Sequence, residues 1–111
     1  GTIIPPPASV PVLALRRSDP GAHALLAMDG SSERAGKPDR VAALVVFRAV
    51  ADGPVRRPEE GAYLGLFTRP RFASNVTAAD RGKTATYFAR WANAKGEPGP
   101  WSNALSVAIA A

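Results

Sequence analysis

The stretch ARWANAKGEPGPWSNALSVAIA, residues 89–110, decides the fold class. In its tail, Leu105, Val107 and Ile109 alternate with small or polar residues, which places three branched side chains on one face of a strand. The preceding residues 95–100 are rich in glycine and proline, which form turns and end strands. The segment before this turn matches the tail in length. We therefore expect residues 84–93 and 103–110 to pair as an antiparallel hairpin.

The rest of the chain is divided by eleven prolines and ten glycines at intervals close to the length of a strand. No window of a dozen residues carries a convincing helical stripe. The valines of residues 40–50 favour a strand over a short buried helix, because a helix restricts β-branched side chains. Residues 30–39 and 51–61 are expected to be loops. The expected strands are 10–15, 22–28, 40–50, 62–68, 71–77, 84–93 and 103–110.

Seven short strands joined by turns most often form a sandwich of two sheets, because each sheet has one apolar face that the other must cover. The alternative is a closed barrel. A chain of 111 residues is one domain by length. The first part, GTIIPPPAS, is expected to be a proline-rich linker over residues 1–9, with the domain at 10–111 and further chain around it.

The expected hairpin gives the two tryptophans different places. Counting by twos puts Trp91 on one face of its strand together with the small residues Ala85 and Ala89, and with Tyr87. Trp91 is therefore expected in the core. Trp101 begins the last strand beside the turn, where an indole ring typically covers the end of a sandwich while part of it meets solvent. A ligand contact is the alternative role for Trp101.

The stretch YFARWANAKGEPGPWSNALSVAI resembles the final hairpin of fibronectin type III domains. The opening IIPPPASVPVLAL is similar to the start of such a domain, so the resemblance covers nearly the whole chain. The chain departs from that pattern in having no tryptophan in residues 22–30 and in placing Ala85 where the tyrosine of the corner motif is usual, with Tyr87 two positions later. The residues at matching positions are Asn93, Gly96, Gly99, Pro100, Trp101 and Ser102.

More narrowly, DRGKTATYFARWANAKGEPGPWSNALSVAI resembles the C-terminal domain of a group of uncharacterised bacterial proteins with an RGK, RW-N and G-E-GPWS signature. The resemblance implies an all-β, immunoglobulin-like (fibronectin type III-like) sandwich of about seven antiparallel strands. It implies no activity.

A surface for interaction is expected on the face of the 84–93 strand that points away from Trp91. This face carries an aromatic ring and a guanidinium group, and further arginines lie nearby in the sequence. If the ring is contiguous with Phe67 or Phe72, the surface marks an interface with another domain. The residues of this expected interaction surface are Phe88, Arg90, Trp101, Arg69 and Arg71.

Residues for catalysis or metal binding are sparse. His23 is the only histidine, no Gly-x-Ser-x-Gly element accompanies it, and we expect it at the surface or at a strand edge. Asp29, Glu33 and Asp39 fit no calcium-loop spacing and are interspersed with basic residues, which indicates a solvated loop. The chain has no cysteine, so neither a disulfide nor a thiolate metal site is expected. We expect no enzyme, no metal and no cofactor.

The charge of the chain is +5, from fourteen basic and nine acidic residues that are spread evenly. This balance is a weak indication of polyanion binding, and no nucleic-acid recognition motif accompanies it. The apolar runs are too short to cross a bilayer. We expect a non-catalytic binding, spacer or assembly module of a larger bacterial protein, acting through protein–protein or interdomain contacts. The alternative is a carbohydrate- or polyanion-binding accessory domain that uses Trp101 and surface arginines.

Overall fold

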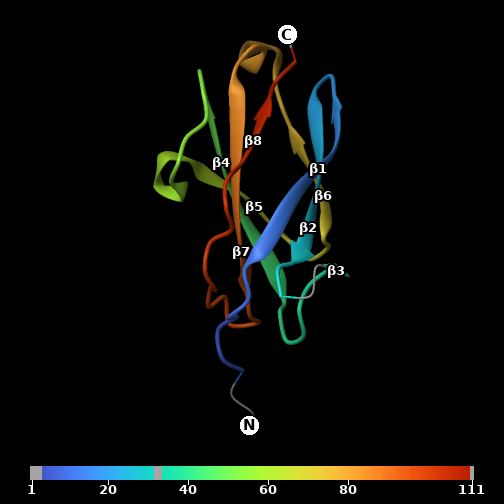
Figure 1. Ribbon diagram of the computed structural model, residues 1–111, viewed down its shortest axis with the longest axis vertical. Coiled ribbons are helices and arrows are strands. Elements are labelled where there is room, and N and C mark those ends of the chain that lie inside the picture. Colours follow the sequence, from blue (N-terminus) through green and yellow to red (C-terminus); the bar gives the residue numbers. More distant parts are fainter. Residues whose placement is uncertain (1–3, 32–33, 111) are drawn as a thin grey trace.

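The computed structural model describes residues 4–31 and 34–110 and contains two packed sheets (Figure 1). In the first sheet, β1 (Pro11–Asp19) and β2 (Ala22–Asp29) pair, and the other edge of β2 pairs with both β6 (Arg71–Asn75) and the short β3 (Arg34–Ala35). The second sheet has the order β5-β4-β7-β8, and the bounds of its strands are Ala62–Phe67, Ala43–Ala51, Thr84–Ala92 and Leu105–Ala108.

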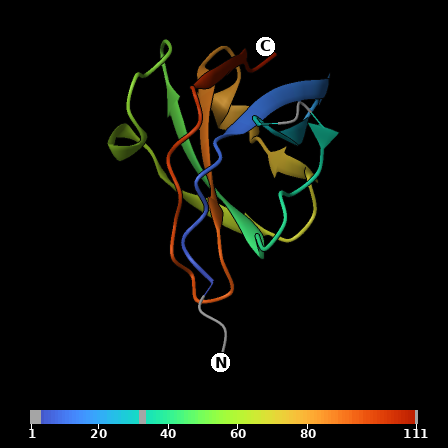
Figure 2. The same cartoon turned by 60° about the horizontal axis from the view of Figure 1, so that its bottom comes forward.

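All of these strand pairs are antiparallel, and the two sheets stack as the layers of a sandwich (Figure 2). The expected all-β, immunoglobulin-like sandwich is therefore confirmed, and the closed barrel is not formed. The start of the described chain, in blue, and its end, in red, lie at opposite poles of the sandwich (Figure 1). No helix in the described part of the chain is long and apolar enough to span a membrane.

Each of the seven expected strands is present, with differences at the ends. β1 runs four residues beyond its expected end at Leu15, because the backbone of Arg17 to Asp19 still pairs with β2 after a bulge. A turn with Gly21 at φ 88° then joins the two strands. The expected loop at 30–39 contains the two residues of β3, and the 3-10 turns η1 (Pro58–Glu60) and η2 (Ala78–Asp80) lie in connections.

The β7–β8 hairpin is confirmed, with Ala85 opposite Val107 and Tyr87 opposite Leu105. Asn93 organises its turn: its Oδ1 accepts the backbone N–H groups of Lys95 at 3.0 Å and Glu97 at 2.9 Å. Its Nδ2 donates to the carbonyl of Ile4 at 3.2 Å, which ties the segment before β1 to the turn. The boundary between residues 9 and 10 stays a prediction.

The core lies between the sheets, where the inward side chains of β4 and β7 meet those of β2 and β6. Trp91, Leu44 and Val46 are fully buried there, as are the small residues Ala85 and Ala89 that flank the large rings. Trp91 is thus a core residue, as expected. Trp101 lies on the other face of the second sheet and is half-buried.

The two tryptophans are expected to differ in their contribution to stability. Trp91→Ala removes a fully buried ring and should lower the free energy of unfolding by about 3–5 kcal/mol. Trp101→Ala removes a half-buried ring and should cost clearly less. Urea melts of both variants measure the difference. Equal losses, or a larger loss at Trp101, would contradict the placement of Trp91 at the centre of the core.

Candidate functional site

The outer face of the second sheet carries a group of large side chains. Strand register aligns them in two rows across the sheet: Tyr63 and Phe88 lie on either side of Phe47, and Leu66 and Arg90 lie on either side of Val45. Trp101 joins them because Ser102 N–H donates to the carbonyl of Ala89 at 2.7 Å, which brings the chain after the turn alongside β7. We call Phe47, Tyr63, Leu66, Arg90 and Trp101 the outer patch.

The rings of the outer patch contact one another in series. Phe47 meets Tyr63 edge-on with centroids 6.1 Å apart and meets Trp101 edge-on at 5.0 Å. The guanidinium carbon of Arg90 lies 4.2 Å from the centroid of the Trp101 ring, a cation–π contact. The Arg90 Nε atom is buried and has no hydrogen-bond partner in the described part of the chain. The attraction between the Arg90 guanidinium group and the Trp101 ring therefore offsets part of the cost of removing this cation from water.

Two side chains of the outer patch remain open to solvent. Tyr63 is 60% exposed and Leu66 is 53% exposed. Both come from β5, the strand at the edge of the sheet. Sequence reasoning missed Phe47, Tyr63 and Leu66. Alternation within residues 62–68 would put Tyr63 and Leu66 on opposite faces, and only the register shift between β4 and β5 brings them to the same face.

The expectation that Phe88 is exposed is wrong, because this side chain is only 2% exposed. Phe88 lies on a central strand directly opposite Phe47, and the chain crosses this face nearby. Val55 N–H donates to Thr86 Oγ1 at 3.3 Å, which holds the β4–β5 connection over the sheet. The stacked rings of Phe67 and Phe72, 4.6 Å apart, lie with the core on the other face, so they do not continue from Phe88.

Arg69 and Arg71 are exposed. They line a shallow cleft between β5 and β6 together with Leu66, which also belongs to the outer patch. Leu66 therefore connects the two arginines to the aromatic part of the outer patch. Four of the five predicted residues thus lie in or beside one surface, and Phe88 lies beneath it.

His23 is 1% exposed, so the expectation of a surface or strand-edge histidine is wrong. It shares the inward face of β2 with Leu25 and Ala27. Its Nδ1 atom is 2.8 Å from the hydroxyl of Tyr87 on β7. Arg48 also points inward, and its Nη1 donates to Ser74 Oγ at 2.7 Å and to the carbonyl of Asn75 at 2.6 Å. We call Arg48, Ser74, Tyr87 and His23 the polar chain.

The surroundings of the polar chain keep His23 and Tyr87 neutral near pH 7. Burial, and then the charge of Arg48, lower the pKa of His23. Burial raises the pKa of Tyr87, although the nearby Ser74 and the charge of Arg48 act in the opposite direction. The structure thus brings together one histidine, one tyrosine and one serine that no sequence pattern had connected.

Of the acidic residues considered for a metal, Glu33 lies outside the described residues. Asp29 Oδ1 accepts hydrogen bonds from Ser9 Oγ at 3.0 Å and Ser31 Oγ at 2.8 Å. Within residues 4–31 and 34–110, no group of three or more His, Asp or Glu side chains is placed to hold a metal ion.

Comparison with known proteins identifies the class of fold. No protein-family model matches the sequence, and no curated protein matches it. The structure is similar to the twitchin kinase region from C. elegans (Fn31-NL-kin-CRD-Ig26), with a TM-score of 0.70, 13% identity and 96% of this chain covered. The chain spans 17% of the length of that structure. The likeness and the sheet order together define an immunoglobulin-like, fibronectin type III-like β-sandwich.

The buried histidine makes stability depend on pH. The pKa of His23 is lowered from 6.5 in the folded state, so unfolding takes up a proton when the pH lies between the two values. The contribution of neutral His23 to the free energy of unfolding is fully present above about pH 6.5, and it is lost as the pH falls through the folded-state pKa. Urea melts from about pH 7.5 to about pH 5 should therefore show a steeper loss of stability for the wild type than for His23→Asn.

His23→Asn removes the only imidazole and leaves every carboxyl group that titrates at lower pH in place. The difference between the two proteins isolates the histidine. Parallel losses in the wild type and the variant would show that His23 is not held neutral by its surroundings.

Proposed function

We propose that the chain is a non-catalytic module of a larger bacterial protein, and that it binds another protein or a neighbouring domain through the outer patch. The observation that carries this proposal is the exposure of Tyr63 and Leu66, 60% and 53%, beside the half-buried rings of Phe47 and Trp101. Large apolar side chains that gather on one face support an interface. Tyrosine, tryptophan and arginine are enriched in such interfaces.

The charge around the outer patch favours an acidic partner. Arg69, Arg71 and Arg90 have no ion pair with any residue in the described part of the chain. Unpaired arginines beside an apolar centre attract carboxylates, and guanidinium groups bind them in a two-pronged geometry. The net charge of +5 acts in the same direction at longer range.

A carbohydrate- or polyanion-binding role is the second candidate. A sugar stacks on an open aromatic ring, but Arg90 lies over the Trp101 ring and Phe47 contacts it from another direction. A polyanion would use Arg69 and Arg71 and would need neither Tyr63 nor Leu66. The exposed apolar residues of β5 therefore favour the protein partner.

Site-specific photo-crosslinking tests the proposal. A benzophenone amino acid is introduced in place of Tyr63 in the full-length protein, expressed in its own cells and irradiated. We expect a discrete protein adduct from position 63. The matched control carries the same group in place of Val12, which is 46% exposed on β1 of the other sheet, and should give no adduct.

In the crosslinking arm, loss of the position-63 adduct in a Leu66→Asp background would support docking through the outer patch. Equal adducts from positions 63 and 12 would contradict it. A second arm measures retention of the isolated chain on immobilised heparin. Salt-sensitive retention on heparin that Arg69→Gln with Arg71→Gln abolishes, without any adduct from position 63, would favour the polyanion role.

A further inference from the structure

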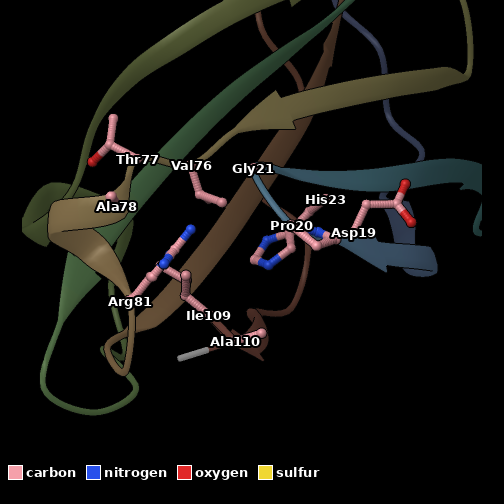
Figure 3. A pocket seen from close by; sticks show the side chains of 10 residues that line it. All are labelled: Asp19, Pro20, Gly21, His23, Val76, Thr77, Ala78, Arg81, Ile109 and Ala110. Carbon is pink, nitrogen blue, oxygen red and sulfur yellow. The ribbon is translucent and has the colours of Figure 1, made fainter.

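A cleft of about 210 Å³ opens at the pole of the sandwich where β8 ends (Figure 3). The β1–β2 turn forms one side, and the segment from Val76 to Arg81 forms the other. Ile109 and Ala110 lie between them. The ring of His23 and the guanidinium group of Arg81 both point into this space (Figure 3). The cleft shares no residue with the outer patch, so its role is independent of the proposed function.

His23 has one ring nitrogen available to the cleft. Its Nδ1 atom is engaged by the Tyr87 hydroxyl, and Nε2 makes no hydrogen bond with any residue in the described part of the chain. The residue is 1% exposed, so its ring is held rigidly with that nitrogen at the inner end of the cleft. A ring nitrogen that opens into the cleft and has no protein partner can bind water or a ligand there.

The polar chain determines which nitrogen of His23 carries the proton. Arg48 only donates hydrogen bonds, so Ser74 Oγ accepts from it at 2.7 Å and has its own hydrogen left to donate. The positive charge of Arg48 acts on the Tyr87 hydroxyl and favours its oxygen facing Arg48, which directs the hydroxyl hydrogen toward His23 Nδ1. In a neutral imidazole that accepts at Nδ1, the proton is on Nε2. The nitrogen that faces the cleft is therefore a donor.

Arg81 supplies the second donor group. Its side chain is exposed and makes no hydrogen bond or ion pair within the described residues. The nearby carboxylate of Asp19 is paired with Arg17 at 2.6 Å, which offsets its repulsion of an anion. The remaining walls include the apolar side chains of Pro20, Val76 and Ile109.

We propose that this cleft binds a carboxylate group on a short apolar stem, whose oxygens accept hydrogen bonds from Arg81 and from His23 Nε2–H. A guanidinium group offers two parallel donors that match the two oxygens of a carboxylate. A single unpaired arginine suits a singly charged anion better than a doubly charged phosphate. The apolar walls contact the stem.

The test uses the only histidine of the chain as its reporter. Long-range ¹H–¹⁵N NMR spectra of the free protein should show the neutral tautomer with hydrogen on Nε2. Propionate should then shift the His23 signals in a saturable manner, whereas propionamide, which has the same shape and no charge, should not. The tautomer with hydrogen on Nδ1, or an absence of saturation by propionate, would overturn the proposal.

A pair of charge-matched variants tests the role of Arg81. Arg81→Met should weaken propionate binding by about tenfold or more, the effect expected for a lost charge-assisted hydrogen bond. Lys83→Met removes the same charge from an exposed residue that does not line the cleft, and should change binding by less than about twofold. Equal weakening of propionate binding by both variants would mean that net charge alone explains the binding, and it would overturn the proposed site.

Two further ligands distinguish the sources of the anion. Inorganic phosphate that binds more tightly than propionate would overturn the preference for a carboxylate. A blocked Gly-Glu-Gly peptide offers the same group on a protein side chain. If it binds more tightly than propionate, the carboxylate comes from an acidic protein segment. Otherwise the ligand is a free carboxylic acid.

Discussion

Two sets of hydrogen bonds cross the space between the two sheets, and the placement of both sheets depends on them. Arg48 of the second sheet binds Ser74 and the Asn75 carbonyl of the first, and Tyr87 of the second sheet meets His23 of the first. Buried polar groups are costly unless they are paired, so sliding one sheet along the other would break these bonds. The polar chain therefore fixes the offset of the sheets and places His23 at the inner end of the cleft.

The outer patch depends on the same central strands, through their opposite face. β4 and β7 direct Leu44, Val46 and Trp91 into the core, and the alternating residues of these strands face outward. A register shift between β4 and β5 then sets Tyr63 opposite Phe47. Without that shift, Leu64 would lie opposite Phe47 and Tyr63 would point inward. The bulge thus lets Leu64 pack against the core while Tyr63 reaches solvent.

The strands, the hairpin and the burial of Trp91 were predictable, because they follow from turn residues and a period of two within short stretches. The outcome for Phe88 was not. Alternation assigns a side chain to a face, but it does not show which parts of the chain lie over that face, as the β4–β5 connection does where Val55 N–H donates to Thr86 Oγ1. His23 was missed for a related reason. Its alternation with Leu25 indicated an inward position, but its partner Tyr87 lies 64 residues away and no local pattern connects them.

A double-mutant cycle between Arg48 and Tyr87 tests most directly whether the polar chain acts as one unit. The free energy of unfolding is measured by urea melts for the wild type, Arg48→Met, Tyr87→Phe and the double variant. If the two residues act through one hydrogen-bonded chain, the losses should be non-additive, with a coupling energy of about 1 kcal/mol or more. Losses that add to within about 0.5 kcal/mol would contradict a connected chain between the sheets.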